Sequence, residues 1–215
     1  MKRIVVVDYG LGNLFSLRRA LVHVGAQVEI AAAPDALSNA DGLVLPGVGA
    51  FGDGMGQLKN RGFVDPIKEC ARSERPILGI CLGMQLLFTH SEEFGLHPGL
   101  DLIPGCVRKL NETDAAGGRI KIPHVGWSEL FYSGSRRWES TLLEGLVEAD
   151  AMYFVHSYIP TPIDDSAVVA RMRYGDHFYG AHVEKNSIAG CQFHPEKSGE
   201  MGLRLLRNFI ARVKN

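Results

Sequence analysis

The feature that most constrains the fold is the regular alternation of short apolar runs with amphipathic stretches through the first half of the chain. The β-branched run of residues 3–9 predicts a buried strand, and residues 13–25 hold apolar side chains at helical spacing until Gly25 ends the pattern. The same reasoning predicts strands in residues 27–30, 41–46 and 75–80, and helices in residues 62–73 and 82–91. Because strands that alternate with helices pair in parallel, this half predicts an α/β sheet with flanking helices.

The second half of the chain changes to strand-like segments separated by turn residues. These segments are residues 106–110, 152–160, 167–174, 177–185 and 187–195. Helical spacing returns only in residues 200–213. The expected fold is therefore a mostly parallel α/β sheet with an antiparallel C-terminal extension and a last helix packed on the parallel part. With 46% hydrophobic content, residues 1–215 are expected to form a single domain.

The balance of charges and the spacing of cysteines exclude several classes of protein. Lysine and arginine number 23 and aspartate and glutamate 24, so the net charge of −1 predicts no broad surface for nucleic acid or an anionic membrane. The four cysteines are widely and irregularly spaced, which is poor evidence for a disulfide framework or a metal site. No apolar stretch approaches the roughly 20 residues that span a bilayer, and the first apolar run is too short for a signal peptide. We expect a cytoplasmic protein without a metal.

One cysteine lies in a frame that suits a nucleophile. Cys81 follows a predicted strand and precedes a predicted helix, with Gly79 and Gly83 two residues away on either side. Glycines at these positions allow a tight turn that projects the central side chain from the end of the strand, near a helix N-terminus that favours a thiolate. The alternative is an inert buried thiol, because free cysteine commonly behaves as a small hydrophobic residue.

A nucleophilic cysteine needs a base and a group that orients the base. His194 and Glu196 are two residues apart near the end of the last predicted strand, so an extended chain would point both side chains the same way. Pro195 favours an extended conformation at His194, and Glu196 is suited to fix the imidazole tautomer. On its own, this short motif is also compatible with a simple strand end at the surface.

The glycine-rich stretch of residues 45–54 follows another predicted strand. Backbone N–H groups in such a loop can converge on an anion, and in acyl chemistry they form an oxyanion hole. A dinucleotide-binding loop is the rival interpretation, because Gly47, Gly49 and Gly52 match the spacing of that fingerprint. That fingerprint belongs in the first strand–helix turn, where Phe15 replaces the third glycine. A nucleotide-binding oxidoreductase is therefore the less favoured alternative.

At these residues the chain resembles the class I glutamine amidotransferases, whose fold is flavodoxin-like. The segments GICLGMQ, QFHPEKS and LPGVGAF are similar to the family's nucleophile, His-x-Glu and oxyanion motifs. DYGLGNLFSL, PHVGWSEL and YFVHSY resemble the glutaminase subunits of imidazole glycerol phosphate synthase, and the likeness runs essentially end to end. The resemblance implies that L-glutamine is hydrolysed to glutamate and ammonia by Cys81, His194 and Glu196, with no cofactor. It implies an oxyanion hole at Gly47, Val48, Gly49 and Leu82, and glutamine binding at Gln85, Glu93, Ser157 and Tyr158.

The resemblance also implies a partner that uses the ammonia. In this family a separate (β/α)8-barrel subunit pairs with the glutaminase as a heterodimer and forms imidazole glycerol phosphate and AICAR in histidine biosynthesis. The positions that match the interface are Leu11, Asn13, Trp127, Tyr153 and Lys197. Ser128 departs from the asparagine usual after the Gly-Trp pair, and related paralogues feed the amination of surface-polysaccharide sugars instead. The sequence therefore leaves the ammonia acceptor open.

Overall fold

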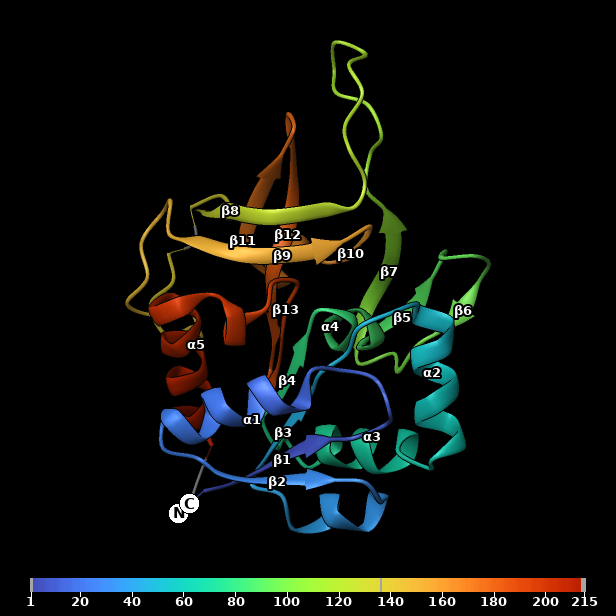
Figure 1. Ribbon diagram of the computed structural model, residues 1–215, viewed down its shortest axis with the longest axis vertical. Coiled ribbons are helices and arrows are strands. Elements are labelled where there is room, and N and C mark those ends of the chain that lie inside the picture. Colours follow the sequence, from blue (N-terminus) through green and yellow to red (C-terminus); the bar gives the residue numbers. More distant parts are fainter. Residues whose placement is uncertain (1, 136, 214–215) are drawn as a thin grey trace.

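The computed structural model of the protein describes residues 2–135 and 137–213 (Figure 1). Five strands in its lower part run in parallel, in the order β2-β1-β3-β4-β13. Their bounds are β1 (Arg3–Val7), β2 (Gln27–Ala31), β3 (Gly42–Leu45), β4 (Ile77–Ile80) and β13 (Ile188–Cys191). The first four follow the 2-1-3-4 order of a doubly wound sheet, in which ligands bind beyond the carboxyl ends of the strands.

Helices cover both faces of these parallel strands. The helices are α1 (Leu14–His23), α2 (Phe51–Asn60), α3 (Val64–Arg72), α4 (Leu82–Leu86) and α5 (Gly199–Arg212). Alternate residues of β1 enter two separate cores, with Ile4 and Val6 packed among side chains of α1 and α5, and Val5 and Val7 among those of α2, α3 and α4. This two-sided burial explains why β1 is a continuous apolar run rather than an alternating one.

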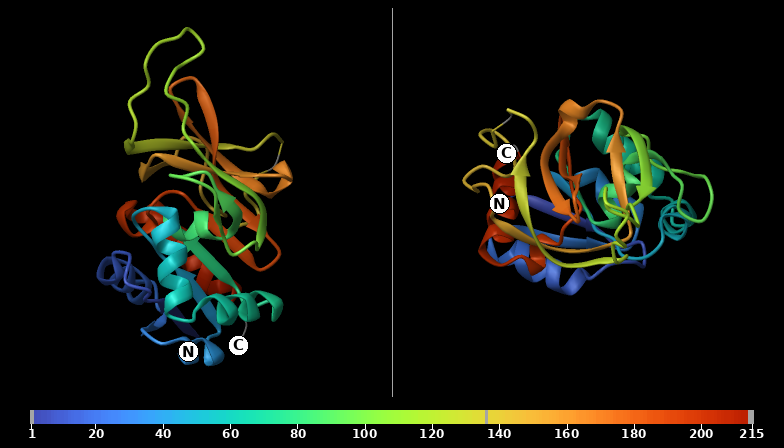
Figure 2. Two further views of the ribbon diagram at one scale, coloured as in Figure 1. Left: turned by 90° about the vertical axis from the view of Figure 1, so that its right-hand side faces the viewer. Right: turned by 90° about the horizontal axis from the view of Figure 1, so that it is seen from above.

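Antiparallel strands extend the sheet beyond β13 and form the upper part of the molecule (Figures 1 and 2). They are β8 (His124–Tyr132), β9 (Ala151–His156), β11 (Val168–Tyr174) and β12 (His177–Lys185). Within the described residues the whole sheet has nine strands, in the order β2-β1-β3-β4-β13-β12-β11-β8-β9. A second sheet contains β5 (Phe88–Ser91), β6 (His97–Pro98), β7 (Ile103–Lys109) and β10 (Tyr158–Pro162). Short 3₁₀ turns occur at Pro34–Asn39, Asp165–Ala167 and Pro195–Lys197. The expected α/β class with an antiparallel extension is confirmed.

Several elements differ from the sequence-based expectation. The single strand expected over residues 152–160 is divided at Ser157 into β9 and β10, which belong to different sheets. The helix expected over residues 82–91 ends at Leu86, because the next carbonyls accept hydrogen bonds from residues 100–103 and the chain continues as β5. The glycine-rich loop expected up to residue 54 is helical from Phe51 onward. Gly52 and Gly54 lie on the packed side of this helix, where an added Cβ would meet His97 and Leu82. Close packing therefore compensates for the low helix propensity of glycine.

The strand β8 has no counterpart among the predicted elements. Burial alternates along its first seven residues, but the sequence does not show this pattern, because the apolar side chains of Val125 and Trp127 lie at exposed positions. Among the described residues no helix has the length and apolar character needed to cross a membrane.

Candidate active site

Cys81 occupies a strained turn between β4 and α4. Its backbone has φ +54° and ψ −113°, which is uncommon for a residue with a side chain and marks a site held in place by its surroundings. The flanking glycines are required by close packing, because a Cβ on Gly79 would lie 2.7 Å from the Gly83 carbonyl oxygen, and one on Gly83 would overlap the Leu45 carbonyl. The turn therefore has the strand–turn–helix geometry of a nucleophile elbow.

His194 and Glu196 follow β13, which pairs in parallel with β4. This pairing brings the end of β13 beside the end of β4, with Cys191 opposite Ile80. The Nδ1 atom of His194 lies 2.9 Å from Oε1 of Glu196, and both side chains are buried. The extended chain expected here is wrong beyond His194, because Pro195–Lys197 forms a 3₁₀ turn closed by the hydrogen bond from Lys197 N–H to the His194 carbonyl. The turn still places both side chains on one side.

The hydrogen bond to Glu196 fixes the orientation of the imidazole. A carboxylate accepts, so Nδ1 carries a proton and Nε2 is left for other partners. Burial on its own lowers the pKa of His194, but interactions with Cys81 and Glu196 outweigh burial and raise it to about 9. The ring is therefore protonated at neutral pH. An imidazolium beside a cysteine favours the thiolate, which is the nucleophilic form.

The Cys81 thiol also contacts two polar groups that the sequence motifs did not single out. Its Sγ lies 3.7 Å from the carbonyl oxygen of Val155, and the side-chain amide of Gln192 donates to the sulfur at 3.6 Å. Gln192 precedes His194 by two residues, and in an extended segment such residues point to the same side. The sequence could therefore have indicated Gln192 as a residue of the site. Tyr9 lies nearby, and burial, followed by proximity to Cys81, raises the pKa of its hydroxyl.

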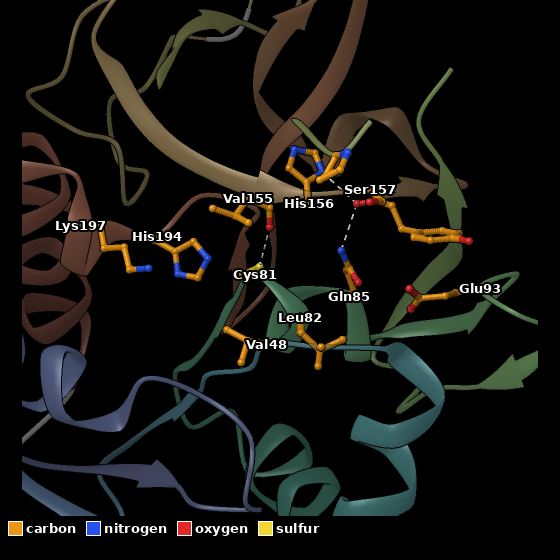
Figure 3. A pocket seen from close by; sticks show the side chains of 13 residues that line it. Val48, Cys81, Leu82, Gln85, Glu93, Val155, His156, Ser157, His194 and Lys197 are labelled. Atoms are coloured by element: carbon orange, nitrogen blue, oxygen red, sulfur yellow. Dashed lines mark hydrogen bonds between the residues drawn. The ribbon is translucent and has the colours of Figure 1, made fainter. Parts of the chain in front are cut away.

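A pocket of about 290 Å³ opens above the thiol (Figure 3). His194 lies on one side of Cys81 in this view, and Gln85 lies on the other, with Glu93 farther along the same side. The lining includes all the residues expected to bind glutamine, namely Gln85, Glu93, Ser157 and Tyr158. Gln85 donates to the Tyr158 carbonyl at 3.0 Å, and Glu93 accepts from the Phe51 backbone N–H at 2.6 Å.

The segment expected to supply the oxyanion hole borders the same pocket. Val48 and Gly49 line it, and Gly49 has φ +104°, a conformation that favours glycine. Leu82 also lines it and is the first residue of α4, so its N–H lies among the free donors at a helix start. Gly47 is packed against Tyr9 and Leu82, with no room for a side chain.

Three of the five residues expected at a partner interface form a cluster on the surface. Trp127 is 58% exposed, which excludes the alternative that it is a core residue. Its ring meets Tyr153 edge to face at 5.9 Å, and the Lys197 ammonium lies 5.7 Å from the centre of the Tyr153 ring. Leu11 and Asn13 lie in the loop between β1 and α1, where the Asn13 side chain caps the helix through Ser16 N–H.

A possible metal-ligand cluster lies outside this pocket. Among the described residues, ligand atoms of His90, Glu92 and Cys106 all lie within 4.8 Å of one another. Glu92 is instead engaged with Arg108 at 3.4 Å, which places a positive charge beside the cluster. This arrangement gives little support for a bound cation.

The comparison with known families agrees with the geometry of the pocket. The family described as class I glutamine amidotransferase matches residues 5–213. The chain belongs to the class I glutamine amidotransferases. Solved structures share the fold at low sequence identity. A chain of PurLQS from Thermotoga maritima gives a TM-score of 0.73 at 20% identity and 99% coverage of both chains. A glutamine amidotransferase from the same organism gives 0.67 at 14% identity, with 99% of this chain and 97% of that one covered.

Curated relatives of this amidotransferase carry one recurring name. Proteins called imidazole glycerol phosphate synthase subunit HisH are 44% identical in Legionella pneumophila strain Paris, over 98% of this chain and 99% of the relative. The protein of that name from Halobacterium salinarum is 49% identical over 96% of this chain and 92% of its own length. The one from Sulfurimonas denitrificans is 47% identical over 96% of both chains.

Proposed function

We propose that this amidotransferase hydrolyses L-glutamine through Cys81, His194 and Glu196 and acts as the glutaminase subunit of an imidazole glycerol phosphate synthase. The observation that carries the proposal is the convergence of three elements on one pocket. The thiol stands on a strained turn, the histidine is hydrogen-bonded to a buried carboxylate at 2.9 Å, and the pocket beside them is lined by Gln85 and Glu93. A single domain supplies every one of these groups.

The chemistry follows from the positions of the groups. Cys81 Sγ attacks the carboxamide carbon of glutamine, and the negative charge on the former carbonyl oxygen is met by backbone N–H groups of Leu82 and the Gly47–Gly49 segment. The protonated His194 gives its proton to the leaving nitrogen, so ammonia departs and a thioester remains. His194 then takes a proton from the water that attacks the thioester, which releases the glutamate product and restores the Cys81 thiolate beside protonated His194.

The amino-acid end of glutamine is held at the far side of the pocket. The Glu93 carboxylate is suited to the substrate ammonium, because opposite charges form strong charge-assisted hydrogen bonds. Ser157, in the break between β9 and β10, and Tyr158, at the start of β10, offer backbone donors for the substrate carboxylate, and Gln85 lies between the two ends. In this proposal the carboxamide lies over Cys81.

The ammonia is used by a partner subunit with a (β/α)8-barrel fold, in a cytoplasmic heterodimer. The printed names of the relatives support the imidazole glycerol phosphate branch over the amination of a surface-polysaccharide sugar. The exposed cluster of Trp127, Tyr153 and Lys197 is the docking surface in this proposal, together with Leu11 and Asn13. Trp127 and Tyr153 suit such a surface, because aromatic residues are enriched in protein interfaces.

The test is reconstitution with the two candidate partners. The purified chain is mixed with the barrel subunit of the histidine pathway or with that of a sugar-amination pathway from the same organism. We expect glutamine-dependent formation of imidazole glycerol phosphate and AICAR with the first partner. Glutamine-dependent amination of a sugar nucleotide with the second partner alone would assign the chain to the other pathway. Absence of glutamate release with either partner would overturn the glutaminase assignment.

A further inference from the structure

Two buried histidines face each other across β8 and β9, outside the proposed catalytic triad. His124 and His156 are direct cross-strand partners and are only 3% and 6% exposed. The Nδ1 atom of His124 lies 3.2 Å from Nε2 of His156. The remaining nitrogens are also engaged, since Ser128 Oγ lies 3.0 Å from His124 Nε2 and the Tyr158 carbonyl oxygen lies 2.9 Å from His156 Nδ1. All four ring nitrogens of the pair therefore have partners.

The tautomer of each ring follows from the Tyr158 carbonyl, which ends this series of hydrogen bonds. The Tyr158 carbonyl can only accept, so His156 carries its proton on Nδ1 and its Nε2 is an acceptor. His124 must then donate from Nδ1, which leaves its Nε2 to accept from the Ser128 hydroxyl. Burial lowers the pKa of His124 to about 4 and that of His156 to about 3, so both rings are neutral at pH 7 and each has one N–H.

The Tyr158 carbonyl connects the histidines to the proposed nucleophile. It also accepts from Gln85 Nε2 at 3.0 Å (Figure 3). Gln85 Nε2 donates its second proton to Gln192 Oε1 at 3.0 Å, and Gln192 Nε2 donates to Cys81 Sγ at 3.6 Å. Both side-chain amides are therefore oriented by their partners, and the amide N–H of Gln192 is directed at the sulfur.

We propose that Ser128, His124 and His156, here called the histidine chain, are positioning residues for glutamine hydrolysis. They hold the Tyr158 carbonyl at the place where it orients Gln85, and through Gln85 they keep an amide donor on the thiol. The inference rests on the glutaminase function proposed above. None of the three residues takes part in bond making or breaking, so their removal weakens turnover without abolishing it.

The histidines also pack, so packing and hydrogen bonding must be separated. The His124 ring lies 4.1 Å from the Tyr174 ring and 5.2 Å from the Phe154 ring, measured between centroids. His124→Phe keeps an aromatic ring among these neighbours but removes both hydrogen bonds. Ser128→Ala removes only the outer hydroxyl of the histidine chain, whereas Ser128→Thr retains a hydroxyl in a residue suited to a strand.

The direct test is nuclear magnetic resonance of the ring nitrogens in the isotope-labelled protein bound to its partner. We expect both His124 and His156 to be protonated on Nδ1 alone at pH 7. Protonation of either ring on Nε2 would overturn the hydrogen-bond order. This measurement needs no turnover, so it tests the histidine chain even if the glutaminase assignment fails.

The kinetic test compares the variants in the assembled complex. We expect Ser128→Ala and His124→Phe to lower kcat/KM for glutamine about three- to tenfold, as for loss of one net hydrogen bond. Ser128→Thr should restore it, and Ser133→Ala, just beyond β8, should leave it unchanged. The reaction driven by added ammonia should stay at the wild-type rate, which verifies folding and assembly. Full glutamine activity in Ser128→Ala and His124→Phe, or equal loss in Ser128→Thr and Ser128→Ala, would overturn the positioning role.

Discussion

The backbone N–H of Cys81 donates to the carbonyl oxygen of Cys191 at 2.8 Å. This single hydrogen bond joins the turn that carries the proposed nucleophile to the strand that leads to the proposed base. The two residues are far apart in the sequence and meet because β4 and β13 pair in parallel. The position of His194 relative to the thiol is thus set by backbone pairing, which side-chain substitutions at the site leave in place.

The first prediction is that Cys81→Ala lowers the rate of glutamine hydrolysis by roughly 10⁶-fold, the loss seen when a catalytic serine nucleophile is removed. The side chain is small and its neighbours are held by the sheet, so the fold should persist. Glutamate release is measured in the complex with the partner. The ammonia-driven reaction serves as the control and should continue, because the partner needs only the product. Glutaminase activity retained by Cys81→Ala would remove the basis of the mechanism.

The second prediction compares the two other members of the proposed triad. Glu196→Gln should impair turnover less than His194→Ala does, because the carboxylate orients and charges the ring whereas the ring itself moves the proton. A glutamine at 196 still offers an oxygen to the His194 Nδ1–H. Values of kcat for both variants decide the order. A nearly active His194→Ala beside a dead Glu196→Gln would show that the roles are reversed.

The third prediction concerns stability at alkaline pH. The pKa of His194 in the folded protein is raised to about 9, above the value near 6.5 in an unfolded chain. Protonation therefore stabilises the fold fully below pH 6.5, and this contribution is lost as the pH rises toward 9. Urea midpoints between pH 6 and 9.5 should fall more steeply for the wild type than for His194→Ala. Parallel curves for the two proteins would contradict the raised pKa.

The fourth prediction concerns stability at acidic pH and a carboxylate far from the pocket. Burial alone raises the pKa of Glu184, but bonds to His182, the Leu142 N–H and Arg212 lower it to about 2. The ionised group thus stabilises the fold above pH 4.5, and this contribution is lost as the pH falls toward 2.

Glu184→Gln should lower the free energy of unfolding at pH 7 by about 1–3 kcal/mol, because it leaves buried donors poorly matched. The difference from wild type should shrink as the pH falls below 4.5. Glu69→Gln is the matched control, since Glu69 pairs with Arg72 on an exposed helix face, and it should have a smaller effect. Equal effects of the two substitutions would show that Glu184 is not a structural anchor.

Local sequence patterns were sufficient to predict the turn at Cys81 and the parallel strands around it. The turn depends on glycines at fixed offsets, and the strands on a continuous apolar run, so both signals lie within a few residues. The helix Phe51–Asn60 was missed because glycines disfavour a helix, and the packing of Gly52 on His97 and of Gly54 on Leu82 is not visible in the local sequence.

The polar network of Gln85, Gln192, His124 and His156 could not be predicted from local sequence either. Gln85 and Gln192 are 107 positions apart, and His124 and His156 are separated by 32. Each of these residues has an ordinary local context, and none has a flanking pattern that predicts its partner. Only the register of β8 on β9 and of β4 on β13 brings them together.

The last prediction concerns control of the glutaminase by its partner. Ammonia released without an acceptor is lost to water, so a freely running subunit would waste glutamine. The segment Pro46–Ala50 lies between β3 and α2, and Gly49 at φ +104° gives it access to backbone conformations closed to other residues. In the chain alone, we expect the backbone N–H groups of this segment to point away from the position of the oxyanion. Binding of the barrel and its ligand should favour the conformation in which they point toward it.

One missing oxyanion donor costs about 10²–10³ in rate, so activation of that size is expected on assembly. The proposed interface adjoins the base directly, since the Tyr153 carbonyl accepts from His194 N–H at 2.9 Å and its ring contacts Lys197. Substitution of the side chain of Asn13, Tyr153 or Lys197 should therefore reduce the rate of glutamine hydrolysis in the activated complex more than the rate of the chain alone. Glutamate release is measured for the chain alone, with the barrel, and with barrel plus acceptor ligand. A lone chain that already runs at the full rate of the complex would refute the gating hypothesis and leave the assignment of Cys81 untouched.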